Sequence, residues 1–247
     1  MVQQVVLTGM VLSSMPIGEY DKRIVLLTDE RGKITAFSRG SRRPNSTMLG
    51  ATEPCVFGKF VLIEGRNSYT LVGAEISRYF MELRNDITGA FLGFYCLELA
   101  GYFTKENMEC REVLNLLVAT FNAVCKKKVP ARLIRRIFEL KMLVIYGTYP
   151  QMFECVKCGR TGQLEYFSEK LSGMVCPLCR KFAGNTLPVM PSSLYAMQYI
   201  ISSEIEKLYS FTVKEDVLTQ MEPVIDRCLK SVAGIKFKSE EMLEMML

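Results

Sequence analysis

No histidine occurs among the 247 residues of the chain. Catalytic centres that use an imidazole as a base, such as Ser-His-Asp and Cys-His arrangements, are therefore excluded, as are metal sites with histidine ligands. From this absence we predict that the protein is not an enzyme, and we assign no catalytic residue.

Long apolar runs are missing as well. The longest, Ile87–Phe103, is interrupted by Glu98 and by glycines, and it is too short and too polar for a membrane span. The N-terminal stretch Met1–Met15 has no basic leader and alternates apolar with polar residues, which indicates a strand rather than a signal peptide. We therefore expect a soluble, cytoplasmic protein with no membrane partner.

A disulfide framework is not indicated, although the chain has nine cysteines. The count is odd, and five of the cysteines stand alone, at positions 55, 96, 110, 125 and 228. This distribution favours a reducing compartment and buried, unpaired thiols. The net charge of +5 is mild, so it permits polyanion binding without requiring it.

Residues 1–76 have the pattern of short antiparallel strands. Turn-forming residues separate five runs rich in β-branched and aromatic residues, which are Val5–Ser14, Arg23–Thr28, Lys33–Ser38, Pro54–Ile63 and Ser68–Ile76. Five such strands predict an OB-fold barrel, with another small barrel or meander as the alternative. The fold class is then α+β, with an OB-fold domain at residues 1–78.

The rest of the chain, residues 79–247, is predicted to be a helical domain. Apolar residues recur at steps of three and four through residues 77–148, and Pro130 and Gly147 stand where helices would begin and end. Two more helices are expected at Ser192–Tyr209 and Lys214–Val232, with Gly234 as a stop. Residues 151–187 interrupt this pattern and are predicted to be an inserted metal-binding segment.

Four cysteines in that segment form two C-x-x-C pairs, separated by seventeen residues: Cys155, Cys158, Cys176 and Cys179. Each spacing lets two sulfurs point at one ion, and the intervening residues suffice for a hairpin with arms at Gln163–Phe167 and Met174–Val175. Four thiolates fill a tetrahedral shell, so we predict a structural Zn²⁺ with no open position for catalysis. A redox pair and an iron–sulfur cluster are alternatives that this spacing favours less.

Basic residues gather in two places. Five of them and no acid lie in Arg31–Arg43, where Lys33, Arg39, Arg42 and Arg43 are candidates for phosphate contacts. The segment Lys126–Lys141 has seven bases against one acid, Glu139. There we expect Arg132, Arg135 and Arg136 to form a basic helix face that binds DNA or an acidic protein tail, or else a plain solvated face.

Four aromatic residues are candidates for stacking on bases or, alternatively, for packing in the core, namely Tyr20, Phe37, Tyr69 and Phe80.

Several segments, in order along the chain, resemble the bacterial RecO family of recombinational-repair proteins. They include Gly18–Lys22, Ile24–Thr28, Ala36–Pro44 with its glycine, arginines and proline, Tyr69–Leu71, Phe80, Leu83-Arg84, Phe138–Leu140, Gly147, Pro150, the four cysteines, and Lys238-Ser239.

The resemblance implies an N-terminal OB-fold and a helical domain with the zinc motif. It implies binding of single- and double-stranded DNA, annealing of complementary strands and partnership with RecR. It also implies that the protein acts with single-strand-binding protein and, indirectly, RecA, in the nucleoid. Lys33, Arg39, Arg42 and Arg43 match the family's basic segment, whereas Arg132, Arg135 and Arg136 follow from charge.

Three other functions are compatible with the residues. An RNA-binding OB protein with a zinc hairpin would carry the same charges, and an adaptor could dock acidic tails on the basic helix. A zinc enzyme is the weakest alternative, because the thiolate shell is full and no histidine can act as a base.

Overall fold

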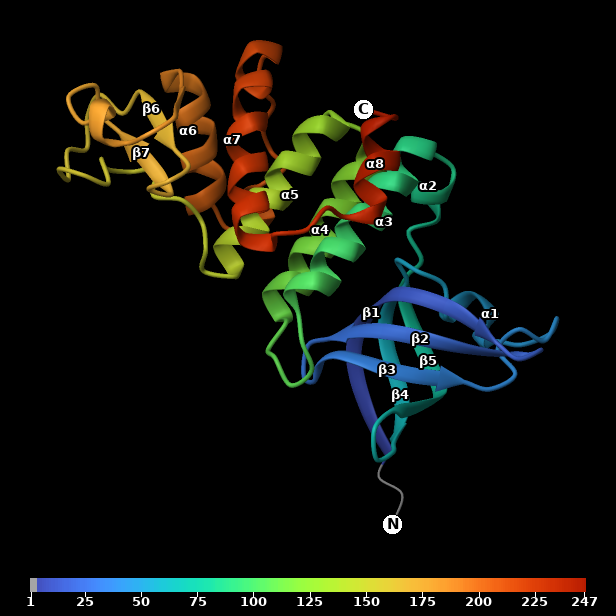
Figure 1. Cartoon of the computed structure of the whole chain (residues 1–247). Coiled ribbons are helices and arrows are strands. Elements are labelled where there is room, and N and C mark those ends of the chain that lie inside the picture. The colour runs from blue at the N-terminus through green and yellow to red at the C-terminus, as the bar shows by residue number, and fades with distance from the viewer. Residues whose placement is uncertain (1–3) are drawn as a thin grey trace. The chain divides into compact units, whose positions relative to one another are not determined.

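The first five strands form a closed barrel in the computed structural model of the chain, which describes residues 4–247. The strands are β1 (Gln4–Ile17), β2 (Asp21–Thr28), β3 (Gly32–Ser38), β4 (Phe57–Glu64) and β5 (Tyr69–Arg78) (Figure 1). Their order is β1-β2-β3-β5-β4, and β1 closes the barrel by pairing with both β2 and β4. The pair β3–β5 is parallel and the others are antiparallel. The predicted five-stranded OB-fold barrel is confirmed.

Alternating side chains of these strands fill the barrel, as the two-residue period of a strand requires. The core consists of Leu7, Val11, Ile24, Leu26, Ile34, Ala36, Val56, Phe60, Leu62, Tyr69 and Leu71. At Gly9, strand β1 pairs with both of its neighbours, because Gly9 is opposite Thr28 of β2 and Gly58 of β4. A Cβ atom on Gly9 would lie 2.4 Å from the carbonyl oxygen of Leu27, so only glycine allows this close approach.

A short helix between β3 and β4 was not predicted from the sequence. It is α1 (Met48–Ala51), and the residues after it are held against the barrel by Lys22 of β2. The buried Lys22 ammonium donates to Oε1 of Glu53 at 2.6 Å and to Oγ1 of Thr52 at 3.0 Å. Lys22 therefore has a structural role within the barrel, although it lies beside the candidate basic segment.

Helices follow the barrel, as predicted. They are α2 (Met81–Arg84), α3 (Ile87–Phe103) and α4 (Arg111–Lys126), and α8 (Lys238–Glu244) packs on α3 (Figure 1). The turn between α3 and α4 is tied to the turn between β2 and β3. The amide of Lys33 donates to the carbonyl of Lys105 at 3.1 Å, and Nε of Arg111 lies 3.0 Å from Oδ2 of Asp29.

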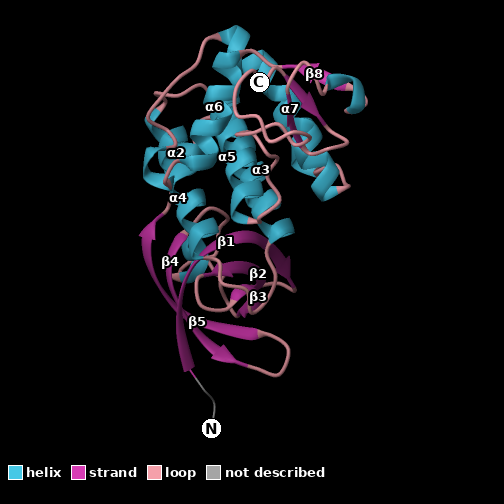
Figure 2. Ribbon diagram, turned by 90° about the vertical axis from the view of Figure 1, so that its left-hand side faces the viewer, coloured by secondary structure: helices cyan, strands magenta, loops and turns pink. Residues whose placement is uncertain are grey.

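The remaining elements are helices α5 (Ala131–Ile145), α6 (Pro191–Ser202) and α7 (Glu215–Ala233), the 3-10 turns η1 (Arg180–Phe182) and η2 (Ile205–Lys207), and strands β6 (Tyr166–Ser168), β7 (Gly173–Val175) and β8 (Thr186–Pro188). The three helices pack on one another, and the strands form a small sheet in the order β7-β6-β8. Figure 2 shows helices and strands in separate colours, with β1–β5 as one curled group. The predicted hairpin is present as β6 and β7, whereas β8 was not predicted.

The expected helix at Ser192–Tyr209 is wrong in its second half. Helix α6 ends at Ser202, and Ser203 is extended, with ψ 147°. The buried ammonium of Lys141 donates to the carbonyl oxygens of Ile201 at 3.1 Å and of Ser203 at 2.6 Å. A cation at a helix C-terminus satisfies carbonyls that lack partners within the helix, so Lys141 stabilises this end.

Two compact units make up the chain. One comprises Met1–Cys125 with Phe237–Leu247, and the other comprises Lys126–Lys236. The predicted domain boundary after residue 78 coincides with the end of β5 at Arg78, and the assignment of domains stays a prediction. Within residues 4–247, no helix has the length and apolar character needed to cross a membrane.

Candidate metal centre and nucleic-acid interface

Each C-x-x-C pair lies in a tight backbone turn, which we call a knuckle. In the first knuckle, the amide of Gly159 donates to the carbonyl of Cys155 at 2.8 Å, and Gly159 has φ +70°. In the second, the amide of Arg180 donates to the carbonyl of Cys176 at 3.1 Å. Both knuckles thus contain a hydrogen bond from the amide of residue i+4 to the carbonyl of residue i. In each knuckle this bond directs the two cysteine sulfurs to the same side.

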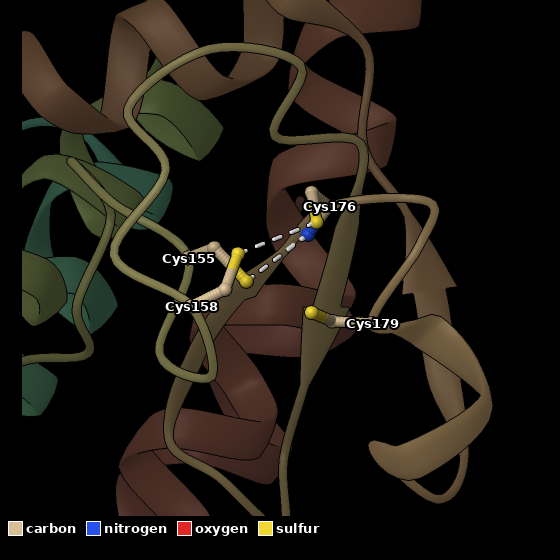
Figure 3. A group of neighbouring side chains, drawn as sticks. All are labelled: Cys155, Cys158, Cys176 and Cys179. Carbon is tan, nitrogen blue, oxygen red and sulfur yellow. Dashed lines mark hydrogen bonds between the residues drawn. The ribbon is translucent and has the colours of Figure 1, made fainter.

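The four sulfurs converge on one point (Figure 3). All lie within 4.8 Å of one another, and Sγ of Cys158 is 3.8 Å from Sγ of Cys176. A tetrahedron with metal–sulfur bonds of about 2.3 Å has an edge of about 3.8 Å, which matches the distance between the sulfurs of Cys158 and Cys176, and the other sulfurs lie at most 4.8 Å apart. The donor set and its geometry therefore fit a metal ion held by four cysteines.

The electrostatics of the cluster also favour a central cation. Burial opposes ionisation of Cys155, but backbone amides, first that of Cys176, donate to its sulfur and lower its pKa to about 6. Burial, followed by hydrogen bonds with the other three thiols, raises the pKa of Cys179 to about 12. Four thiolates at this spacing repel one another, so a divalent cation would be needed to keep all of them ionised.

The small sheet holds the two knuckles together. Gly173 of β7 pairs with Gln151, whose carbonyl accepts a hydrogen bond from the amide of Met174 at 2.8 Å. A Cβ atom on Gly173 would lie 2.6 Å from Cγ1 of Val156, in the first knuckle. The backbone thus approaches too closely for any side chain at this position.

The segment after β3 forms a loop that is bound to the turn between β1 and β2. The amide of Gly40 donates to Oδ1 of Asp21 at 2.8 Å, and Nη1 of Arg42 donates to the carbonyls of Gly18 and Glu19 at 3.2 and 3.1 Å. These bonds give the basic loop a fixed conformation.

Four exposed arginines and two exposed aromatic residues gather around this loop. Arg43 lies 5.5 Å from the ring centre of Tyr20, and Arg23 of β2 is directly opposite Phe37 of β3 on the outside of the barrel. We call this set the barrel basic surface: Tyr20, Arg23, Phe37, Arg39, Arg42 and Arg43. None of the four arginines forms an ion pair with any residue in the described range 4–247.

Arg23 was missed in the sequence. The sequence could have indicated it, because Arg23 stands at an outward-facing position of β2, between the buried residues Lys22 and Ile24. Two candidates for base stacking, Tyr20 and Phe37, are exposed, whereas Tyr69 and Phe80 are buried in the protein.

Lys33 does not join the barrel basic surface. It is the second residue of β3, six residues before Arg39, so about 20 Å of extended chain separates the two. Its ammonium donates to the carbonyl oxygen of Gly101 in α3. The structure thus brings together Arg39, Arg42 and Arg43 of the predicted contacts and leaves Lys33 apart.

The expected basic face on α5 is wrong for Arg135 and Arg136, because both are buried. Glu139 accepts from Nε of Arg135 and from Nη1 of Arg136, each at 2.8 Å. Arg136 also pairs with Asp226 of α7.

Arg132 is partly exposed and binds two acids of the same unit. Nη2 of Arg132 lies 2.8 Å from Oε2 of Glu222, and its Nη1 pairs with Glu215. Helix α7 therefore supplies acids that neutralise the face of α5 on which a cationic stripe was expected.

Comparison with known proteins places both halves of the chain in one family. The model for the recombination protein O N terminal matches residues 1–80, and the model for the recombination protein O C terminal matches residues 84–241. The chain is 31% identical to the DNA repair protein RecO of Alkaliphilus metalliredigens, over 83% of this chain and 84% of that one. It is 29% identical to that of Acetivibrio thermocellus (90% and 89% covered) and 26% identical to that of Bacillus subtilis (96% and 93% covered).

Since the two models together match nearly all of the sequence, and relatives of the same name align with it over most of their length, the chain belongs to the recombination protein O (RecO) family.

Proposed function

We propose that the protein is a DNA-binding mediator of recombinational repair. In this role it anneals complementary single strands and, with RecR, helps to load RecA onto DNA that is coated with single-strand-binding protein. Membership of the RecO family and the name DNA repair protein RecO on its relatives support the proposal. The observation that carries it is the barrel basic surface, where arginines that pair with no acid among residues 4–247 stand beside exposed rings.

Annealing requires no bond-making by the protein. Two strands repel each other through their phosphates, and cationic side chains reduce that repulsion while releasing condensed counterions. Arg39, Arg42 and Arg43 would contact phosphates, and Tyr20 and Phe37 offer faces on which bases stack. The protein would bind single and double strands without reading sequence, and it would act as a mediator rather than an enzyme, at the nucleoid in the cytoplasm.

The metal in the four-cysteine centre is proposed to be Zn²⁺ with a structural role. Cys155, Cys158, Cys176 and Cys179 would hold it, and four thiolates leave no position for a substrate or a water molecule. The ion would cross-link the two knuckles, which are also connected by backbone hydrogen bonds such as that from the amide of Val156 to the carbonyl of Met174. Elemental analysis of the purified protein is expected to give one zinc per chain, and iron in its place would contradict the assignment.

Salt-dependent binding tests the proposed function. The triple variant R39A/R42A/R43A is expected to bind single-stranded DNA more weakly, with a log–log salt slope reduced by about 2, because each phosphate contact contributes about 0.7. The matched control is K59A/K105A/K128A, which removes the same charge at exposed positions outside the barrel basic surface. Equal affinity and slope in the arginine variant and the wild type would contradict the assignment of this surface.

A matched RNA oligonucleotide and a strand-annealing assay complete the test. Tighter binding of RNA than of DNA would favour the RNA-binding alternative, and absence of annealing under conditions where DNA is bound would remove the proposed activity.

A further inference from the structure

The second knuckle carries a pair of exposed cations that the metal centre does not use. Arg180 and Lys181 form the turn η1 directly after Cys179, and both are exposed. No acid occurs between Glu169 and Glu204 in the sequence. In the part of the chain that the structure describes, neither cation forms an ion pair. Their charge is thus available to a partner.

Apolar side chains accompany these cations on the same knuckle. Leu178 is 66% exposed and Phe182 is 63% exposed, so two large apolar side chains are open to solvent beside the cations. The Arg180 guanidinium lies 4.3 Å from the ring centre of Tyr166, and Lys181 Nζ lies 5.0 Å from that of Phe182. Stacking on Tyr166 of β6 fixes the position of the guanidinium, while Phe182 keeps an accessible face.

A hollow of about 520 Å³ lies beside the cations. Its lining is rich in hydrogen-bond donors and contains no acid: Pro177, Arg180, Lys181, Gly184, Asn185 and Thr186. Guanidinium, ammonium, amide and hydroxyl groups together suit phosphate oxygens. Exposed Phe182 next to them suits the planar face of an unpaired base.

From these observations we propose that the second knuckle is a separate contact site for single-stranded nucleic acid. In this site, Arg180 and Lys181 bind phosphates, and Phe182 stacks on a base. The inference rests on the proposed function and adds a second surface to it. A docking site for an acidic protein segment would use the same cations, but the exposed ring of Phe182 beside them favours the planar face of a base.

Two contact sites would matter for annealing. The barrel basic surface belongs to the unit Met1–Cys125, and the second knuckle belongs to the unit Lys126–Lys236. One molecule could then hold two strands, or two stretches of one strand, and linked sites raise the effective concentration of one strand near the other.

The experiment compares the metal-loaded full chain with the variants R180A/K181A and F182A. The probe is fluorescent oligothymidylate of about 30 nucleotides, long enough to span more than one site. We expect R180A/K181A to bind about three- to tenfold more weakly at low salt, with a log–log slope smaller by about 1.4 for two lost phosphates. F182A should lose the ultraviolet cross-link between the protein segment 177–187 and thymine while keeping the wild-type slope.

The control K214A/K230A removes two exposed charges from the same unit, away from the second knuckle. Metal content and thermal midpoint of every variant should equal those of the wild type. If R180A/K181A retains wild-type affinity and slope while the wild type binds, the second site is refuted and the barrel surface stands. Equal losses in the control would also refute it, since only net charge would then matter.

A polyglutamate peptide distinguishes the rival partner. Loss of peptide binding with unchanged oligonucleotide binding in R180A/K181A would identify a protein-docking surface and overturn the inference. A wild-type chain that binds no oligonucleotide would refute the proposed function, and this inference with it.

Discussion

The carboxylate of Glu98 in α3 caps the first turn of α8 through Ser239. It accepts a hydrogen bond from the amide of Ser239 at 2.9 Å and another from its hydroxyl, across 141 positions of sequence. The amide of Lys238 donates to the same carboxylate at 3.1 Å. A helix N-terminus has amides without intrahelical partners, so an acid from another helix can satisfy them.

Replacing Glu98 with alanine should loosen the C-terminal segment. Burial opposes ionisation of Glu98, but the bonds from Ser239 and Lys238 outweigh it and keep the pKa of the carboxyl below its ordinary value. A lowered folded-state pKa stabilises the protein above the unfolded pKa, and this contribution is lost as pH falls through the folded value. We expect E98A to cost about 1–2 kcal/mol at neutral pH, and progressively less as the pH falls below about 4, the ordinary range of a glutamate carboxyl.

Urea unfolding at several pH values would measure this effect. E244A is the matched control, because it removes an exposed acid from α8 itself. A loss in E98A that stayed constant into the acid range would show that the charge on Glu98 is not responsible.

The buried ion cluster on α5 gives a larger prediction. Glu139 is fully buried and accepts from Arg135 and Arg136, so alanine at this position would leave two guanidinium groups poorly compensated. Breaking such a buried pair typically costs about 3–5 kcal/mol. E139A should therefore unfold at much lower denaturant concentration, whereas E215A, which removes an exposed partner of Arg132, should cost less than about 1 kcal/mol. Similar losses in both would contradict the structural role of the cluster.

The same cluster shows what the sequence could not predict. Helical periodicity correctly places Arg132, Arg135 and Arg136 on one face of α5, because that depends only on spacing. Whether the face meets solvent depends on Glu222 and Asp226, which are 90 positions away from their partners and come from α7. Charge counts within one segment cannot reveal acids supplied by another helix.

Local patterns predicted other features well. The strands of the barrel follow from alternating apolar residues and turn signals, and the cysteine cluster follows from two identical short spacings. Helix α8 was not predicted, because it has only seven residues and its first turn is capped by Glu98 from α3. Short elements depend on tertiary contacts more than on their own propensity.

Gly173 provides a test of the sheet that joins the two knuckles. A methyl group there would lie 2.6 Å from Val156 and 2.8 Å from the carbonyl oxygen of Gln151, so G173A must displace the strand. We expect a loss of about 1–3 kcal/mol and weaker retention of metal against a chelator. Gly162 is the matched control, because a Cβ atom there meets nothing within 4 Å. Equal chelator sensitivity of G173A and G162A would show that the sheet does not support the centre.

Lys33 and Arg23 have different surroundings, so we expect the variants K33A and R23A to differ in stability and in the salt dependence of DNA binding. K33A removes the ammonium that binds the carbonyl of Gly101, so it should lower the free energy of unfolding by about 1 kcal/mol and leave the salt slope of DNA binding unchanged. R23A removes an exposed cation that forms no ion pair within the described part of the chain, so it should reduce the slope by about 0.7 and leave stability unchanged. Thermal unfolding and salt titration of both variants measure these effects. If K33A reduced the salt slope as much as R23A does, Lys33 would contact DNA after all. A lysine whose ammonium is bound to a helix carbonyl should release no counterion when DNA binds, so we expect no such reduction.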